Sequence, residues 1–187
     1  MDTLAKPIFL VGPMGAGKTT IGKRLASALH GNFLDHDDYI IEQAKMTIPQ
    51  IFDTYGEPYF RDLEHRCLQS LLDPNFQAQD MLKPVPAPNV IAGGGGIAQR
   101  ADNRALIKEH SLCLYLHLPV GKQYERVKGD TNRPMIQVED IYSRLQALFA
   151  VRDIQFREIA TCIIDTDDTI DNIVTKTLNA LEPYLKR

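Results

Sequence analysis

The segment Gly12–Thr19, with the sequence GPMGAGKT, constrains the fold of this chain more than any other. It follows the apolar run Ile8–Val11 and precedes apolar positions spaced as in a helix, namely Ile21, Leu25 and Leu29. A strand, a glycine-rich loop ending in Lys-Thr and a helix form the P-loop arrangement that binds nucleotide phosphates. The alternative is a glycine-rich turn with a chance Lys-Thr. The flanking strand and helix favour the P-loop.

The residue types of this loop predict its chemistry. Glycines allow successive backbone N–H groups to converge on one phosphate at the N-terminus of the following helix. Lys18 is expected to reach the β- and γ-phosphates of ATP. The Thr19 hydroxyl is expected to bind the Mg²⁺ that bridges them.

Length and charge exclude several classes of protein. A chain of 187 residues fits one domain that can bury a core without disulfides or metals. Its 21 basic and 24 acidic residues give a formal charge of -3, so no general attraction to nucleic acid or anionic membranes is expected. The three cysteines contain no Cys-x-x-Cys pair, and residues 1–7 lack an apolar targeting core. We therefore expect a cytoplasmic protein with reduced thiols.

Alternating strand and helix patterns predict an α/β three-layer sandwich, in which helices cover both faces of a five-stranded parallel sheet. Proline-rich residues 73–89 are expected to form a surface loop, and residues 129–137 a lid. Strands are predicted at residues 8–11, 32–35, 90–92, 112–117 and 161–165, and helices at 18–30, 38–44, 47–55, 58–72, 101–109, 119–128, 138–158 and 170–184.

Two acids follow the second predicted strand. In extended geometry Asp35 and Asp37 point to one side while His36 points away. Because ligands bind at the carboxyl ends of parallel strands, Asp35 suits a metal ligand and Asp37 a base for the attacking hydroxyl. The alternative is a solvated strand end or a helix N-cap at Asp37 or Asp38. His36 is expected to be exposed.

Arginines and glycines complete the candidate site. Arg61 lies three residues before Glu64 on a predicted helix, so Glu64 can hold its guanidinium ready to bind a carboxylate, or the two form an ordinary surface ion pair. The run Gly93–Gly96 directly follows a predicted strand, which favours close approach of backbone to a ligand over a flexible linker. Arg126 and Arg133 flank the predicted lid, where they can contact a base or phosphates, or belong to a solvated charged loop.

Together these motifs resemble the shikimate kinase family over essentially the whole chain. The resemblance rests on ordered motifs, namely Gly12–Thr19, Phe33–Asp37, Ile51-Phe52, Gly56-Glu57, Phe60-Arg61 with Glu64, Gly93–Gly96, Arg133-Pro134 and Arg152. It implies one P-loop kinase domain over 1–187 with a fold like that of nucleoside monophosphate kinases, a lid at 129–137 and a shikimate-binding helical region at 36–64. It also implies transfer of the ATP γ-phosphate to the 3-hydroxyl of shikimate, a step towards chorismate and the aromatic amino acids.

The resemblance also implies roles for individual residues. Those expected to bind shikimate are Asp37, Arg61, Gly94 and Arg152. Those expected to bind ATP are Gly15, Ala16, Gly17, Lys18, Thr19, Thr20, Arg126 on the adenine and Arg133 closing with the lid. Thr19 and Asp35 would bind Mg²⁺, and Asp37, Lys18 and Arg133 would be catalytic. We expect a monomer whose partner is its small-molecule substrate.

Three segments depart from the family pattern. Ala92 replaces a frequent Thr, and the stretch 73–89 is longer than usual. Arg152 is followed by Asp153–Phe156 in place of an Asn-Pro-Leu-Tyr-like segment. Arg157 therefore stays open as an alternative to Arg152 for contact with the substrate carboxylate.

Two other functions are compatible with parts of the sequence. Another small P-loop kinase, such as a gluconate kinase, shares the P-loop and the early acids, and gluconate also carries a carboxylate. The discrimination rests on Phe60-Arg61, the glycine run and Arg152 together. A non-catalytic nucleotide-binding module is the second alternative, although the Asn-Lys-x-Asp motif of GTPase-type switches is missing from the sequence.

Overall fold

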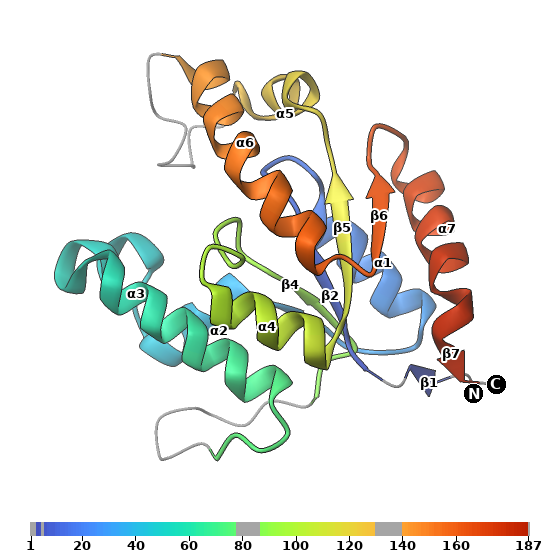
Figure 1. Cartoon of the computed structure of the whole chain (residues 1–187), viewed down its shortest axis with the longest axis horizontal. Coiled ribbons are helices and arrows are strands. Elements are labelled where there is room, and N and C mark those ends of the chain that lie inside the picture. The colour runs from blue at the N-terminus through green and yellow to red at the C-terminus, as the bar shows by residue number, and fades with distance from the viewer. Residues whose placement is uncertain (1–2, 5, 78–86, 130–139, 187) are drawn as a thin grey trace.

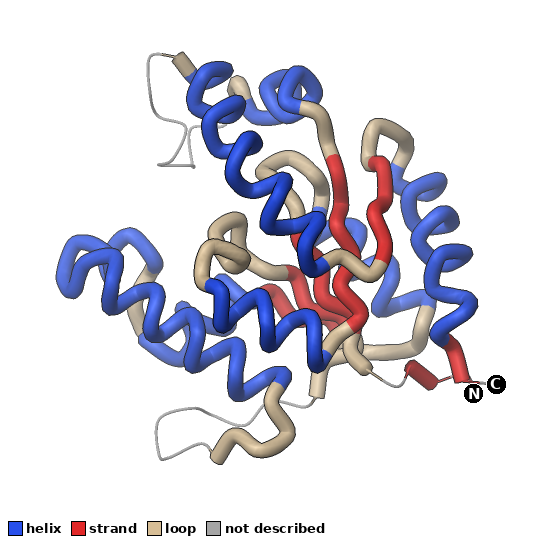
Figure 2. Tube along the Cα trace, in the orientation of Figure 1, coloured by secondary structure: helices blue, strands red, loops and turns tan. Residues whose placement is uncertain are grey.

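The computed structural model describes residues 3–4, 6–77, 87–129 and 140–186. Its centre is a five-stranded sheet in the order β3-β4-β2-β5-β6 (Figures 1 and 2). Every pair of neighbouring strands in it is parallel, which confirms the predicted sheet. The strands are β2 (Ile8–Val11), β3 (Phe33–Asp35), β4 (Val90–Ala92), β5 (Leu112–His117) and β6 (Cys162–Asp165).

Helices cover both faces of this sheet, as the sequence predicted (Figure 1). One layer holds α1 and α7, which pack against each other, and the other holds α4 between α3 and α6. The described helices are α1 (Lys18–Ala28), α2 (His36–Ala44), α3 (Ile48–Leu72), α4 (Ala101–His110), α5 (Val120–Val127), α6 (Ile141–Ile159) and α7 (Ile170–Leu181). Within the described ranges, no helix has both the length and the apolar character needed to cross a bilayer.

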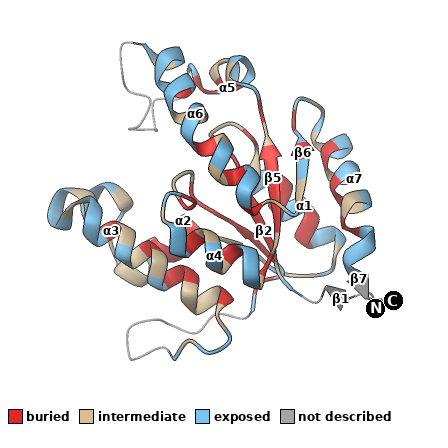
Figure 3. Cartoon of the chain, viewed as in Figure 1, coloured by how far each residue is buried: buried red, intermediate tan, exposed pale blue. Residues whose placement is uncertain are grey.

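The sheet separates two hydrophobic cores, and its middle strand β2 contributes to both. Side chains alternate along a strand, so Ile8 and Leu10 pack in the core beneath α1 and α7. Phe9 and Val11 point the other way, into the core beneath α3, α4 and α6. All four residues are completely buried, and Figure 3 shows this buried centre between exposed outer helix faces. Burial on both faces accounts for the near-continuous apolar sequence of β2.

Helix α3 is interrupted where the sequence predicted a break. Gly56 has φ 82° and ψ 171°, outside the helical region, so the predicted helices 47–55 and 58–72 meet there at a kink. The predicted capping box is present at the start of α3. Thr47 Oγ1 accepts a hydrogen bond from the Gln50 backbone at 3.4 Å, and Gln50 Oε1 accepts one from the Thr47 backbone at 2.9 Å.

The structure adds one element that the sequence analysis missed. Thr3–Leu4 (β1) pairs with Leu185–Lys186 (β7) in an antiparallel two-stranded sheet, which brings the two ends of the chain together (Figure 1). Such short segments carry no period by which to recognise a strand. Most of the predicted lid, and residues 78–86 of the predicted proline-rich loop, lie outside the described residues.

Candidate active site

The glycine loop forms as a P-loop at the carboxyl end of β2. Gly15 and Gly17 have φ angles of 79° and 84°, which glycine adopts without strain, and Gly17 is the N-cap of α1. Lys18 Nζ donates hydrogen bonds to the carbonyl oxygens of Gly12 at 2.8 Å and Pro13 at 3.1 Å. The ammonium group therefore lies over the loop, at the N-terminus of the helix where a phosphate is favoured.

The predicted metal ligands lie in contact. Thr19 Oγ1 donates a hydrogen bond to Asp35 Oδ2 at 3.0 Å, which places two oxygen atoms side by side next to the P-loop. In the described part of the chain, no group of three or more His, Cys, Asp or Glu side chains is placed to hold a metal. A pair of oxygens beside a phosphate site fits Mg²⁺, which usually keeps several waters and shares its coordination with substrate phosphates.

The local geometry around Asp35 differs from the extended one predicted. Asp35 is the N-cap of α2 and its Oδ1 accepts a hydrogen bond from the backbone of Asp37 at 3.1 Å, so the helix begins at His36. The proposed alternative of an N-cap at Asp37 or Asp38 was also wrong. A carboxylate following a short strand is a strong N-cap, and it started the helix earlier than the apolar pattern indicated.

Asp37 lies beside the glycine run. A Cβ atom on Gly94 would lie 2.5 Å from Asp37 Oδ1, so only glycine allows this approach. Burial, together with the nearby carboxylates of Asp35 and Glu64, raises the pKa of Asp37 to about 6, although the Lys18 ammonium acts in the opposite direction. Asp37 therefore binds a proton more readily than an ordinary aspartate, a property that its predicted role as a base requires.

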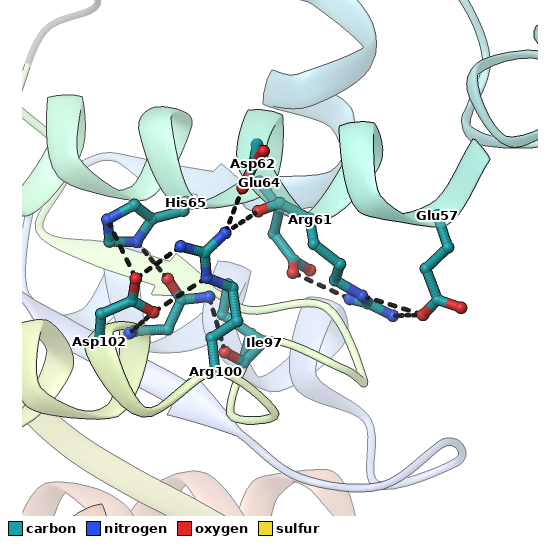
Figure 4. A network of polar contacts seen from close by, with 9 residues as sticks. Glu57, Arg61, Asp62, Glu64, His65, Ile97, Arg100 and Asp102 are labelled. Atoms are coloured by element: carbon teal, nitrogen blue, oxygen red, sulfur yellow. Dashed lines mark hydrogen bonds and ion pairs between the residues drawn. The ribbon is translucent and has the colours of Figure 1, made fainter. Parts of the chain in front are cut away.

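Arg61 is held as predicted. Its Nη1 donates to Glu64 Oε2 at 2.9 Å, and its Nε and Nη2 lie 3.3 Å from Glu57 Oε1 (Figure 4). Glu64 is only 2% exposed, and burial raises its pKa against the opposing effect of the Arg61 guanidinium. The ion pair of Arg61 and Glu64 is thus largely buried, which excludes the alternative of an ordinary surface pair.

Arg152 lies against the same glycine run. Its side chain is 6% exposed, and a Cβ on Gly95 would lie 3.3 Å from its Nη1. Among the described residues no side chain forms an ion pair or hydrogen bond with it. Burial, followed by the positive charge of Arg61, lowers its pKa. Arg157, the alternative, is half exposed and instead pairs at 2.8 Å with Asp153, which also accepts a hydrogen bond from the Tyr115 hydroxyl.

The remaining predicted site residues surround the P-loop. Arg126 donates to the carbonyl oxygens of Gly15 at 2.8 Å and Thr166 at 2.7 Å, and so connects the P-loop with the loop after β6. Ala16 is buried and Thr20 is exposed in the first turn of α1. Arg133 lies outside the described residues, so its predicted role stays a prediction.

His36 was predicted wrongly. Its side chain is completely buried, and in the described structure neither ring nitrogen has a hydrogen-bond partner. Burial lowers its pKa to about 4, so the ring is neutral at physiological pH. In place of the predicted strand end at residues 35–37, α2 begins at His36, and this earlier start turns the side chain inwards.

Two sets of polar groups follow the neighbouring strands β2 and β4. The P-loop after β2, with Thr19 and Asp35, suits a nucleotide, and the run Gly93–Gly96 after β4 is surrounded by Asp37, Arg61 and Arg152, which suit a hydroxylated anion. A P-loop kinase requires this juxtaposition, because its donor and acceptor must meet in line. The fold and the site therefore define the class as a P-loop kinase of small molecules.

Comparison with known proteins gives the family. A sequence model of shikimate kinase matches residues 14–182. A shikimate kinase of Marinomonas sp. (strain MWYL1) is 37% identical over 97% of this chain and 95% of its own length. The solved structure "Shikimate kinase from Acinetobacter baumannii in complex with shikimate" superposes with a TM-score of 0.82 at 37% identity, over 95% of this chain and 93% of that one. The chain belongs to the shikimate kinase family.

A gluconokinase structure from Sinorhizobium meliloti 1021 also resembles this chain. It has a TM-score of 0.52 and 15% identity, and the alignment covers 96% of this chain and 93% of the gluconokinase. At this identity the likeness shows a shared fold alone. It confirms the predicted relation to the fold of small P-loop kinases and gives no support to gluconate as the acceptor.

Proposed function

We propose that this chain transfers the γ-phosphoryl group of ATP to the 3-hydroxyl of shikimate, on the way to chorismate and the aromatic amino acids. The relatives described above carry the name shikimate kinase, and one of them was solved with shikimate bound. The observation that carries the proposal is the buried guanidinium of Arg152, which forms no ion pair or hydrogen bond with any described side chain.

A carboxylate is the ligand that this arrangement favours. Leaving a buried charge unpaired is costly, and Arg152 lies close enough to Arg61 for the two positive charges to oppose each other. A substrate carboxylate between them would neutralise both and accept several charge-assisted hydrogen bonds. Gly94 would then let the ring of shikimate approach Asp37.

The nucleotide would bind on the P-loop side. The backbone amides of Gly15, Ala16, Gly17 and Thr20 and the ammonium of Lys18 would hold the phosphates. Thr19 and Asp35 would hold Mg²⁺, which when bound neutralises charge on the transferred phosphoryl group. Arg126 would lie against the adenine, and Arg133 would reach the phosphates from the lid at 129–137.

Asp37 is the proposed base. It would orient the 3-hydroxyl and accept its proton as the oxygen attacks the γ-phosphorus. Its pKa of about 6 supports this role, because the carboxylate is mostly ionised at neutral pH yet binds a proton more readily than an ordinary aspartate. Lys18 would stabilise the negative charge that develops on the transferred group.

We further propose that residues 1–187 form a single kinase domain, with residues 36–64 as the shikimate-binding region, and that the protein acts as a cytoplasmic monomer. Its net charge of -3 supports the absence of a nucleic-acid or membrane partner. The burial of Cys67 and Cys113, far apart in different elements, supports a compartment in which thiols stay reduced.

A coupled assay of ADP release tests the proposal. The protein is given Mg-ATP with shikimate, and in parallel with gluconate or a nucleoside monophosphate. Release that depends on shikimate alone is the expected result. If no acceptor stimulates release although ATP binds, the proposed reaction is refuted and a non-catalytic nucleotide-binding module becomes the better account.

A further inference from the structure

The first turn of α4 carries polar side chains that the proposed reaction does not use. Arg100 is the N-cap residue of this helix, and Asn103 and Arg104 follow within its first turn. Arg100 and Asn103 contact α3, Arg104 contacts α6, and α4 itself packs between these two helices (Figure 1). These are the two helices that carry Arg61 and Arg152.

Arg100 connects α4 with the helix of Arg61. Its Nη1 donates to Asp62 Oδ1 at 2.6 Å and to the backbone carbonyl oxygen of Arg61 at 3.3 Å. Its Nε and Nη2 donate to the two oxygens of Asp102 at 3.0 and 2.6 Å (Figure 4). One edge of the Arg100 guanidinium is therefore held by Asp102 of its own helix. The other edge binds α3 at Asp62 and at the backbone of Arg61.

Asn103 reinforces the same connection from a buried position. Its Nδ2 donates to the carbonyl oxygen of Ile97 at 3.0 Å, which leaves Oδ1 facing His65 Nδ1 at 2.6 Å. Since an amide oxygen only accepts, His65 must carry its proton on Nδ1 in this contact. Asn103 is completely buried, so these bonds are shielded from water.

Arg104 extends the connection to the loop and to α6. Its Nη1 donates to the carbonyl oxygens of Ala98 at 2.9 Å and Gln99 at 3.1 Å. Its Nε lies 3.0 Å from Glu158 on α6, as an ion pair without hydrogen-bond geometry. Arg104 thus holds the end of the loop that contains Gly93–Gly96, and it also contacts α6, the helix that carries Arg152.

The loop after β4, which these side chains hold, lies against both Arg61 and Arg152. A Cβ on Gly96 would lie 2.8 Å from Arg61 Nη1, and one on Gly95 would lie 3.3 Å from Arg152 Nη1. Two neighbouring guanidinium groups repel each other, so their separation in the free protein has to be imposed by the surrounding structure. The contacts of α4 are placed to impose it.

We propose that the first turn of α4 is a spacer that sets the separation of Arg61 and Arg152, with Arg100 as the principal positioning residue for the grip on the substrate carboxylate. This inference rests on the proposed function. A binding group misplaced by about 1 Å can lower the rate by about 100-fold. Loss of the spacer should therefore weaken the binding of shikimate. The predicted nucleotide site, with whose described residues Arg100 forms no hydrogen bond or ion pair, should be unaffected.

The test compares Arg100→Ala with wild type and with a matched control, Arg24→Ala. Arg24 forms an exposed ion pair with Asp171 in the opposite helix layer and takes no part in the site. In Arg100→Ala we expect the KM for shikimate to rise about tenfold, with the KM for ATP within twofold of wild type. Arg100→Lys, which keeps the charge but loses the three-way contact, should fall between the two. The control should match wild type.

A neutral analogue of shikimate distinguishes positioning from general loosening. It carries a hydroxymethyl group in place of the carboxylate, and its affinity is measured as competitive inhibition. Because it lacks the charge that the two arginines bind, Arg100→Ala should leave its inhibition constant within twofold of the wild-type value. An analogue weakened as much as shikimate, or an unchanged KM for shikimate, would overturn the proposal.

Two further arms keep the outcomes separate. If Arg100→Ala does not fold, Asp62→Ala removes the oxygen that accepts the hydrogen bond from Arg100 Nη1, and an unchanged KM for shikimate in that variant refutes the spacer. The wild-type arm alone tests the proposed function. A wild-type protein that does not phosphorylate shikimate refutes the reaction, whereas an active wild type with an unaffected Arg100→Ala refutes only the role of α4.

Discussion

Asp37 is the side chain on which the proposed chemistry depends most directly. Asp37→Asn keeps the size of the side chain beside Gly94 but removes the base. We expect kcat to fall by about 10² to 10⁴, the usual contribution of general base catalysis. The affinity for ATP, measured by titration calorimetry, should stay within a few-fold of wild type. A kcat within tenfold of wild type would contradict the assignment.

The choice between Arg152 and Arg157 is tested by a pair of alanine variants on one helix. Arg152→Ala removes a buried guanidinium at the glycine run, so the KM for shikimate should rise by about 10- to 100-fold, as expected for the loss of a charge-assisted hydrogen bond. Arg157→Ala removes a half-exposed guanidinium that pairs with Asp153 and has no contact with the glycine run among the described residues, so the KM for shikimate should change less than threefold. Steady-state kinetics of both variants decide between them, and equal effects would argue against the assignment.

His36 makes the stability of the fold depend on pH. Its pKa is lowered from 6.5 to about 4 by burial, so between these values the unfolded chain binds a proton that the folded chain does not. The unfolded state then holds more protons, and the free energy of unfolding falls by about 3 kcal/mol as the pH is lowered through this window. His36→Phe should lose this contribution.

Urea unfolding at pH 7 and pH 4 in metal-free buffer measures the contribution of His36 to the free energy of unfolding. The difference in unfolding free energy between wild type and His36→Phe should change by about 3 kcal/mol between the two pH values. Taking the difference largely removes the contributions of other groups. Among those groups Asp37 matters most, because its raised pKa acts in the opposite direction to that of His36 and stabilises the folded state as the pH falls through 6. Parallel pH profiles for the two proteins would refute the prediction.

Residue-level prediction succeeded where the partners are local. The pairing of Arg61 with Glu64 and the P-loop position of Lys18 follow from spacings of a few residues. It failed for His36 because the burial of one side chain depends on where its helix begins. The contact of Arg100 with Asp62 joins residues 38 positions apart, and nothing in the local sequence indicates it.

At the scale of elements, the start of α3 offers a clean test of local stability. Thr47→Ala removes the side chain that accepts a hydrogen bond from the Gln50 backbone, and should lower the free energy of unfolding by about 1 kcal/mol. Thr54→Ala, on the exposed face of the same helix, is the matched control and should change it by less than about 0.5 kcal/mol. Urea unfolding of both variants gives the comparison, and equal losses would show that the cap contributes nothing specific.

Elements with a strong period or strong end signals were predicted closely. The break at Gly56 follows from a glycine before Pro58, and β5 from a long apolar run. The start of α2 was misplaced because one acidic N-cap outweighed the apolar pattern. Strands β1 and β7 were missed because each has two residues and depends on a partner at the other end of the chain.

At the scale of the whole molecule, the two layers determine which thiols are accessible. Cys67 and Cys113 are completely buried, and burial raises the pKa of the Cys67 thiol to about 12. Cys162 is only partly buried. A disulfide reagent at pH 8 should therefore modify no more than one thiol in the native protein and three after denaturation. Cys162→Ser should show no fast reaction, and rapid modification of two native thiols would contradict the packing.

The order of the strands was beyond the reach of sequence analysis. Alternating strands and helices predicted a parallel sheet, but one sequence cannot show that β4 lies between β2 and β3. That order is what brings the glycine run next to Asp37 and both arginines. Local sequence patterns were enough to select these residues as site candidates, whereas their closeness in space depends on long-range packing.

The place of β4 between β3 and β2 also bears on how this chain can vary over evolution. The loop that leaves β4 approaches Asp37, Arg152 and Arg61 with three successive glycines, Gly94, Gly95 and Gly96. The length of this loop therefore determines which glycine lies beside which side chain. One inserted residue would shift all three contacts at once. At the opposite, amino end of β4, residues 73–77 and 87–89 belong to the connection between α3 and β4 and are not among the neighbours of Gly94–Gly96. Insertions should therefore accumulate in the connection between α3 and β4 and not in the loop that follows β4.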